Sequence, residues 1–117
     1  GGTQRLARAI GPYRAMLLLL TAGRMTAQEA FDAGLVSKLA TTDDTVAEAI
    51  LIASTIASMP PLAVGEIKQV LHAGLGIGLD AALMLERRAA YLLFDSADKR
   101  EAMQSFIEKR KPVFTGT

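Results

Sequence analysis

The chain of 117 residues contains no cysteine and a single histidine. Without cysteine there is neither a disulfide nor a thiolate metal site. His72 has no metal-ligating residue one helical turn away, because Lys68 and Gly76 occupy those positions. A lone histidine also gives no recognisable Ser-His-Asp or Cys-His catalytic set. We therefore expect no metal site and take His72 to be a structural or solvated residue.

Net charge and long apolar runs are also scarce. Thirteen basic and 12 acidic residues leave a charge of +1, which gives no electrostatic reason to expect nucleic acid or a membrane surface as a partner. The longest strongly apolar run, Ala15–Leu20, is far shorter than the roughly 20 residues of a membrane span. The polar start of the chain does not resemble a signal peptide. We expect a cytoplasmic protein with no nucleic-acid or membrane partner.

Helix signals are abundant by contrast. Hydrophobic residues make up 50% of the chain, which we take as enough for one modest core. Capping patterns and apolar residues at i, i+3 and i+4 predict a mainly α fold of about seven helices, with at most one short strand at 35–40. The expected helices begin at Thr3, at Pro12, after the capping box at Thr26, at Thr42-Asp43-Asp44, near Leu62, at Leu79 and after Asp95-Ser96-Ala97-Asp98. The loop near residue 41 divides the chain into 1–41 and 42–117.

The glycines at 74, 76 and 78 form the one segment with a superficial likeness to a phosphate-binding loop. The pattern is not GxGxxG, because Leu79 stands at the last position. A helix rather than a strand is expected before it, so the dinucleotide-binding context is absent. We interpret these glycines as the end of one helix and the start of the next.

The acidic residues offer no pair placed for general acid–base catalysis, which needs two carboxylates in one dry pocket. We interpret them as surface charges in salt bridges; they are Glu29, Glu48, Glu66, Glu86, Glu101 and Glu108. The C-terminal run at 106–112 is more informative. Phe106 and Lys109 are three residues apart and are expected on one helix face. An aromatic ring beside a lysine can stack on a nucleobase and hold a phosphate, although a plain basic helix end remains the alternative.

Three stretches, taken together, resemble the crotonase (enoyl-CoA hydratase/isomerase) superfamily. They are Gly1-Gly2-Thr3-Gln4-Arg5-Leu6; Leu19-Leu20-Thr21-Ala22-Gly23-Arg24-Met25-Thr26-Ala27-Gln28-Glu29-Ala30 followed by Ala33-Gly34-Leu35-Val36; and Phe106-Ile107-Glu108-Lys109-Arg110-Lys111-Pro112-Val113-Phe114. Gly78 departs from the family, in which Ser or Thr is common at that helix start. The resemblance implies that the chain is the C-terminal portion of such an enzyme, separated by proteolysis or by design and inactive alone.

The resemblance also implies where the chemistry lies. The oxyanion-binding amides and two catalytic glutamates of the family belong to a preceding spiral core, so no catalytic residue is expected in this chain. Phe106 and Lys109 match positions that reach the adenine and phosphate end of coenzyme A. Tyr91 and Phe94 match a helix that borders the acyl pocket. Residues 1–41 correspond to helices that follow the core, and residues 42–117 to the helices through which members form trimers and hexamers.

The implied function is that of an enoyl-CoA hydratase, which adds water to 2-enoyl-CoA thioesters; coenzyme A carries the substrate, and no covalently bound cofactor is expected. One alternative is an enoyl-CoA isomerase or another branch of the superfamily. A second is a non-catalytic helical module that self-associates, as a dimer or another assembly, through apolar surface. A small DNA-binding domain is disfavoured by the near-neutral charge.

Overall fold

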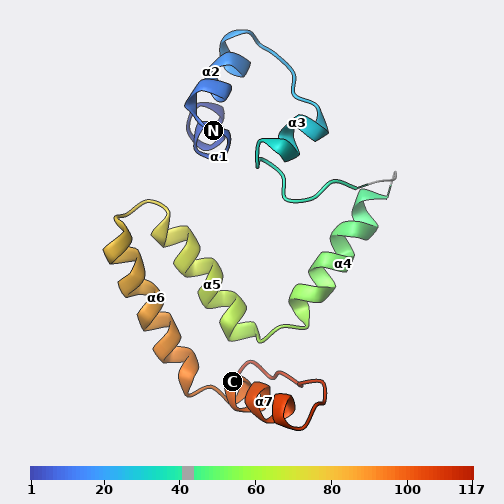
Figure 1. Ribbon diagram of the computed structural model, residues 1–117, viewed down its shortest axis with the longest axis vertical. Coiled ribbons are helices and arrows are strands. Elements are labelled where there is room, and N and C mark those ends of the chain that lie inside the picture. Colours follow the sequence, from blue (N-terminus) through green and yellow to red (C-terminus); the bar gives the residue numbers. More distant parts are fainter. Residues whose placement is uncertain (41–43) are drawn as a thin grey trace. The chain divides into compact units, whose positions relative to one another are not determined.

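The computed structural model describes residues 1–40 and 44–117, and Figure 1 traces their elements. Within these residues the regular structure is seven α-helices and one π-helix, with no strand. The prediction of a mainly α fold is confirmed. The chain divides into two compact units, Gly1–Thr45 and Val46–Thr117. The expected helix start at Thr42 and Asp43, and the expected boundary after residue 41, fall on residues outside the described ranges.

The first unit begins with the π-helix η1 (Gly2–Leu6), which continues into α1 (Ala7–Ile10). The expected cap at Thr3 is wrong, because Thr3 lies inside η1 and the carbonyl of Gly1 accepts from Arg5 N at 2.8 Å. The helix therefore begins two residues earlier than expected, with Gly1 at the cap position and no side-chain cap bond. Gly11, with φ 85°, turns the chain into α2 (Pro12–Leu20), whose first residue is the predicted proline.

Helix α3 (Ala27–Asp32) begins with the predicted capping box. Glu29 N donates to Thr26 Oγ1 at 3.2 Å, and Thr26 N donates to Glu29 Oε2 at 2.7 Å, which lowers the pKa of Glu29. The helix ends at Asp32, and Gly34 follows in the turn with φ 74°. The amides of Leu35 and Val36 donate back to the Ala30 carbonyl. The described residues at 35–40 form no strand, because a strand needs a neighbouring strand to pair its backbone groups.

The second unit contains α4 (Thr45–Ala57, from Val46 on), α5 (Pro61–Gly74), α6 (Leu79–Phe94) and α7 (Ala97–Ile107). Helices α5 and α6 pack as an antiparallel hairpin (Figure 1). The glycine segment ends α5 at Gly74 and precedes α6 at Gly78, as the sequence predicts. No single described helix has the length and apolarity to cross a membrane; α4 and α5 meet those criteria only as a pair, bent by 109°.

The expectation of a modest core is wrong. Among the described hydrophobic residues only Ile10, Ala15 and Ala89 are buried. Large apolar side chains on α4 and α5 are open to solvent, including Leu51 at 62% exposure and Leu71 at 59%. The apolar periodicity is real, but most of these helix faces have no partner within either unit. Large exposed apolar side chains in such number are typical of a surface that packs against further protein.

Gly78 offers a simple test of helix capping. It has extended geometry (φ −65°, ψ 150°), no side-chain cap bond, and no atom within 4 Å of an added Cβ. We expect Gly78→Ser to raise the free energy of unfolding by about 0.5–1 kcal/mol, because serine supplies the cap and reduces the freedom of the unfolded chain. Denaturant unfolding of the full-length protein measures this. Gly78→Ala is the control for loss of glycine alone, and an equal gain from it would rule out the capping contribution.

Candidate functional site

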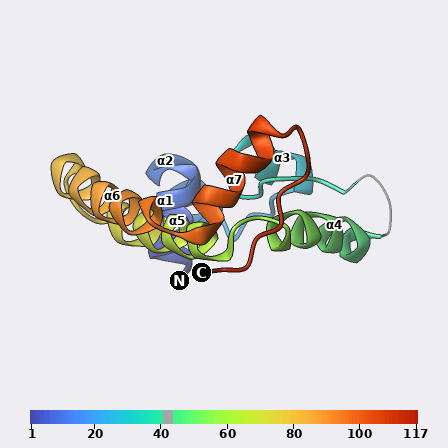
Figure 2. The same ribbon diagram turned by 90° about the horizontal axis from the view of Figure 1, so that it is seen from below.

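The C-terminal tail, residues 112–117, folds back along α7 and is fixed at the start of that helix (Figure 2). Asp98, in the first turn of α7, is only 2% exposed. Its Oδ1 accepts from Thr115 N at 2.7 Å, and its Oδ2 accepts from Gly116 N at 2.9 Å. The Thr117 carbonyl accepts from Ala97 N at 2.6 Å. Helix start and chain end therefore satisfy each other's backbone groups.

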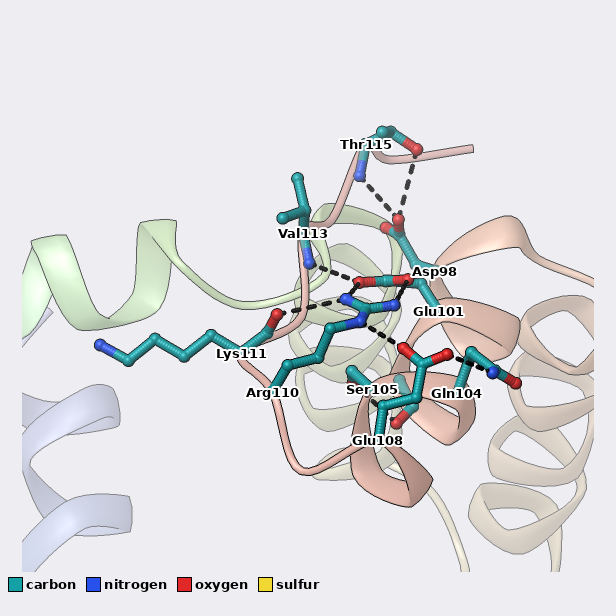
Figure 3. Close-up of polar contacts among 10 residues, drawn as sticks. Asp98, Glu101, Gln104, Ser105, Glu108, Arg110, Lys111, Val113 and Thr115 are labelled. Carbon is teal, nitrogen blue, oxygen red and sulfur yellow. Dashed lines mark hydrogen bonds and ion pairs between the residues drawn. The ribbon is translucent and has the colours of Figure 1, made fainter.

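A second attachment joins the middle of α7 to the chain just after it (Figure 3). The Arg110 guanidinium donates to both oxygens of Glu101, at 2.5 and 2.8 Å. Its Nε donates to Glu108 Oε2 at 2.5 Å. Val113 N donates to Glu101 Oε1 at 2.8 Å. The prediction that Glu101 and Glu108 take part in salt bridges is confirmed, and their common partner is Arg110.

These contacts change the protonation of both carboxylates. The hydrogen bonds from Arg110, followed by the amide of Val113, lower the pKa of Glu101 from 4.5 to about 2. The Gln104 amide and then Arg110 lower the pKa of Glu108, and both carboxylates raise the pKa of Arg110. Because the folded state depresses the pKa of Glu101, its stabilising contribution is present above pH 4.5 and is lost as the pH falls toward 2.

We expect a carboxyl NMR titration of Glu101 in the full-length protein to show this shift. The midpoint should lie well below 4.5, near 2, because the Arg110 contact favours the ionised form. Arg110→Gln is the control and should return the midpoint toward the ordinary value. A wild-type midpoint at the ordinary value would show that the Glu101–Arg110 contact does not persist in solution.

Lys109 lies at the turn that ends α7 and has φ 54°, the left-handed region that favours glycine. Lys109 N donates to the Phe106 carbonyl at 3.3 Å, and Arg110 N donates to the Ser105 carbonyl at 3.0 Å. The expectation that Phe106 and Lys109 share a helix face is wrong, because α7 ends at Ile107 and this Schellman turn redirects the backbone. Both side chains are exposed, Phe106 at 85%. They lie three residues apart, at the two ends of one turn rather than on one helix face.

Tyr91 and Phe94 lie near the end of α6 and are exposed at 69% and 66%. The two side chains have different surroundings. Phe94 lines a hollow of about 350 Å³ together with Leu62 and Ala102, whereas Tyr91 is not among its lining residues. Lys99 Nζ lies 4.7 Å from the centre of the Phe94 ring, a cation–π contact.

Two further regions bear on the search for a site. In the first unit, α2 and α3 border a hollow of about 550 Å³ lined by apolar residues and by Arg14, Arg24, Glu29 and Asp32. His72 is exposed on α5. Across residues 1–40 and 44–117, no three His, Cys, Asp or Glu side chains come together as a metal-ligand group. Sequence reasoning did not anticipate the clustering of Asp98 and Glu101 with the tail, because the sequence separates these carboxylates from their partners by 9 to 18 residues.

The described residues form helices with exposed apolar faces, which is typical of a segment that packs against further protein. The sequence pattern described as enoyl-CoA hydratase/isomerase matches residues 1–117, and the chain belongs to that family. The resemblance inferred from the three sequence stretches is thereby confirmed. The match to the family covers the stretch that contains Phe106 and Lys109.

Individual relatives give the same result. The chain is 42% identical over 114 residues to a probable mitochondrial enoyl-CoA hydratase of Dictyostelium discoideum, covering 97% of this chain and 41% of the relative. It is 40% identical over 116 residues to the 2,3-dehydroadipyl-CoA hydratase of Escherichia coli, covering 99% of this chain and 46% of that protein. The chain thus spans less than half the length of these curated relatives.

Solved structures share the fold. A crystal structure of enoyl-CoA hydratase from Bacillus anthracis superimposes with a TM-score of 0.94 at 40% identity, covering 100% of this chain and 45% of the other. The enoyl-CoA hydratase of Mycobacterium tuberculosis gives a TM-score of 0.92 at 33% identity, with 100% and 46% coverage. At this identity the likeness supports both the fold and the family.

Proposed function

We propose that these residues are the C-terminal portion of an enoyl-CoA hydratase, a lyase that adds water across the double bond of a 2-enoyl-CoA thioester. The similarity to named hydratases along nearly the whole chain carries this proposal. The chain spans only 41% and 46% of the length of those relatives, which supports the proposal that it is a portion of such an enzyme. The hydratase names favour this branch over an isomerase.

In this proposal the reacting groups lie outside the chain, and the α7 end holds the substrate. Its acidic side chains have structural partners: Glu101 accepts from Arg110 and Val113, and Asp98 accepts from Thr115. A carboxylate whose oxygens are already engaged by donors of the same chain is poorly placed to exchange protons with water or substrate. Asp98 and Glu101 are therefore not proposed as acid–base groups of the intact enzyme.

Lys109 and Phe106 are proposed to bind the phosphate and adenine end of coenzyme A. The left-handed backbone at Lys109 supports this role, because a lysine there is less stable than glycine by about 1–2 kcal/mol. Both side chains are exposed, so an ammonium is available for a phosphate and an aromatic ring for a nucleobase. Phe94, and more remotely Tyr91, are proposed to border the acyl pocket, which fits the apolar hollow at Phe94.

The exposed apolar faces of α4–α6 support a further part of the proposal, self-association of the intact enzyme as a trimer or hexamer. Ile50 and Ile67 are exposed at 58% and 57%, which is costly for side chains of this size unless they are covered. Analytical ultracentrifugation of the full-length protein measures the assembly. A monomer at high concentration would contradict this part.

The hydratase proposal is tested by assaying the full-length protein with crotonyl-CoA and following consumption of the conjugated double bond and formation of the hydroxyacyl thioester. Conversion to the hydroxyacyl product supports a hydratase. Migration of the double bond in a 3-enoyl-CoA substrate without hydration would assign the protein to the isomerase branch. A protein that assembles but converts neither substrate would be the non-catalytic self-association module.

A further inference from the structure

The turn at Lys109 holds a lysine in a conformation that L residues other than glycine rarely adopt. Its φ of 54° is maintained by the backbone bonds of Lys109 and Arg110 to Phe106 and Ser105. These two backbone bonds are the local support of the turn, and Lys109 itself is exposed to solvent. A conformation of this kind persists when surrounding contacts over-determine it.

Glu101 supplies those surrounding contacts. It lies two helical turns before Lys109, and its carboxylate receives Arg110, the next residue after Lys109, through two hydrogen bonds of 2.5 and 2.8 Å. The same carboxylate accepts from Val113 N at 2.8 Å. The chain is thus held to α7 at two points just beyond the strained residue, as Figure 3 shows.

The geometry of this contact is well defined. The Glu101 side chain is 23% exposed and that of Arg110 is 41% exposed. A planar guanidinium paired with a planar carboxylate through two parallel bonds fixes orientation as well as distance. Glu108, held by Gln104 at 2.6 Å, contacts Arg110 from the other side through Nε. The two carboxylates therefore restrict rotation of the guanidinium, and this restricts movement of the turn that precedes Arg110.

We infer that Glu101 is a positioning residue for the coenzyme A end of the site: by holding Arg110 and Val113 N it fixes the turn that carries Lys109. This inference rests on the proposed role of Lys109. Asp98 performs a different task, because its contacts are to Thr115 and Gly116 at the far end of the tail. The two carboxylates can therefore be separated by experiment.

The test is steady-state kinetics of the full-length enzyme with crotonyl-CoA and with crotonyl-pantetheine, which lacks the adenine and its phosphates. We expect Glu101→Gln to raise KM for crotonyl-CoA about threefold with kcat nearly unchanged, because one carboxyl oxygen and the charge are lost but the scaffold remains. KM for crotonyl-pantetheine should stay within error. Glu86→Gln, a carboxylate on α6, is the matched control and should change neither value.

The decisive comparison is the double variant Glu101→Gln/Lys109→Ala. If Glu101 acts through Lys109, the first change should add nothing to KM once Lys109 is absent. Additive effects, or an equal KM increase for crotonyl-pantetheine, would overturn the inference and leave Glu101 as a structural residue. If Lys109→Ala alone leaves KM for crotonyl-CoA unchanged, the proposed role of Lys109 fails instead. The proposed hydration reaction is judged separately by its product.

Discussion

Asp98→Ala is expected to lower the free energy of unfolding of the full-length protein by about 3 kcal/mol, the scale of two hydrogen bonds to a buried charged group. The carboxylate is 2% exposed and accepts from Thr115 N and Gly116 N. It also places a negative charge in the first turn of α7, where the helix dipole favours it. Its removal leaves two tail amides without an acceptor.

The effect should extend beyond α7. Gly116, with φ 79°, lies so close to the start of α5 that an added Cβ would be 3.4 Å from Pro61. The tail therefore joins α7 to α5, and its release should loosen both. Amide hydrogen exchange at Thr115 and Gly116 should accelerate together with the loss of stability, because their acceptor is gone.

Asp95→Ala is the matched control for this prediction. Asp95 is the same residue type three positions earlier, but its side chain is fully exposed and pairs with Arg100 at 3.2 Å. Exposed ion pairs contribute about 0–1 kcal/mol, so this variant should lose little stability. Equal losses in the two variants, or unchanged exchange at Thr115 in Asp98→Ala, would show that the tail is not held by Asp98.

Lys109→Ala is expected to raise the Kd of the full-length enzyme for coenzyme A about fivefold, equivalent to about 1 kcal/mol for one exposed charge-assisted contact. Isothermal titration calorimetry measures this change. Lys111→Ala, which removes the same charge two residues later, is the control. If both variants lose affinity equally, the coenzyme responds to general basic charge and not to the fixed lysine.

Lys109→Gly separates binding from stability. Glycine adopts φ 54° without a Cβ clash, so this variant should be more stable than wild type by about 0.5–1 kcal/mol after the larger freedom of glycine in the unfolded chain is deducted. It should lose as much affinity as Lys109→Ala. A simultaneous rise in stability and loss in affinity would show that Lys109 lowers the stability of the fold and that its side chain contributes to coenzyme A binding. Reduced stability would contradict the assignment of strain to this turn.

Local signals in the sequence were sufficient for the helices. Pro12 at a first position, the capping box at Thr26 and the glycines at 74 and 78 each predicted a boundary that the structure contains. These signals are reliable because they depend on residues at most a few positions apart, whose backbone and side-chain groups satisfy the helix ends directly. The cap expected at Thr3 failed because the helix begins at Gly2, with Gly1 at the cap position and no side-chain cap bond.

The sequence by itself determined the helical class, most helix ends, the family and the stretch that contains Phe106 and Lys109. Only the tertiary structure showed that the apolar periodicity of α4–α6 does not form a core here, because burial depends on a partner surface and not on the pattern alone. It also placed Lys109 in a strained turn and joined Asp98 and Glu101 to the tail. Those contacts link residues 9 to 18 positions apart, which backbone periodicity cannot specify, because they form only when the chain reverses direction after α7.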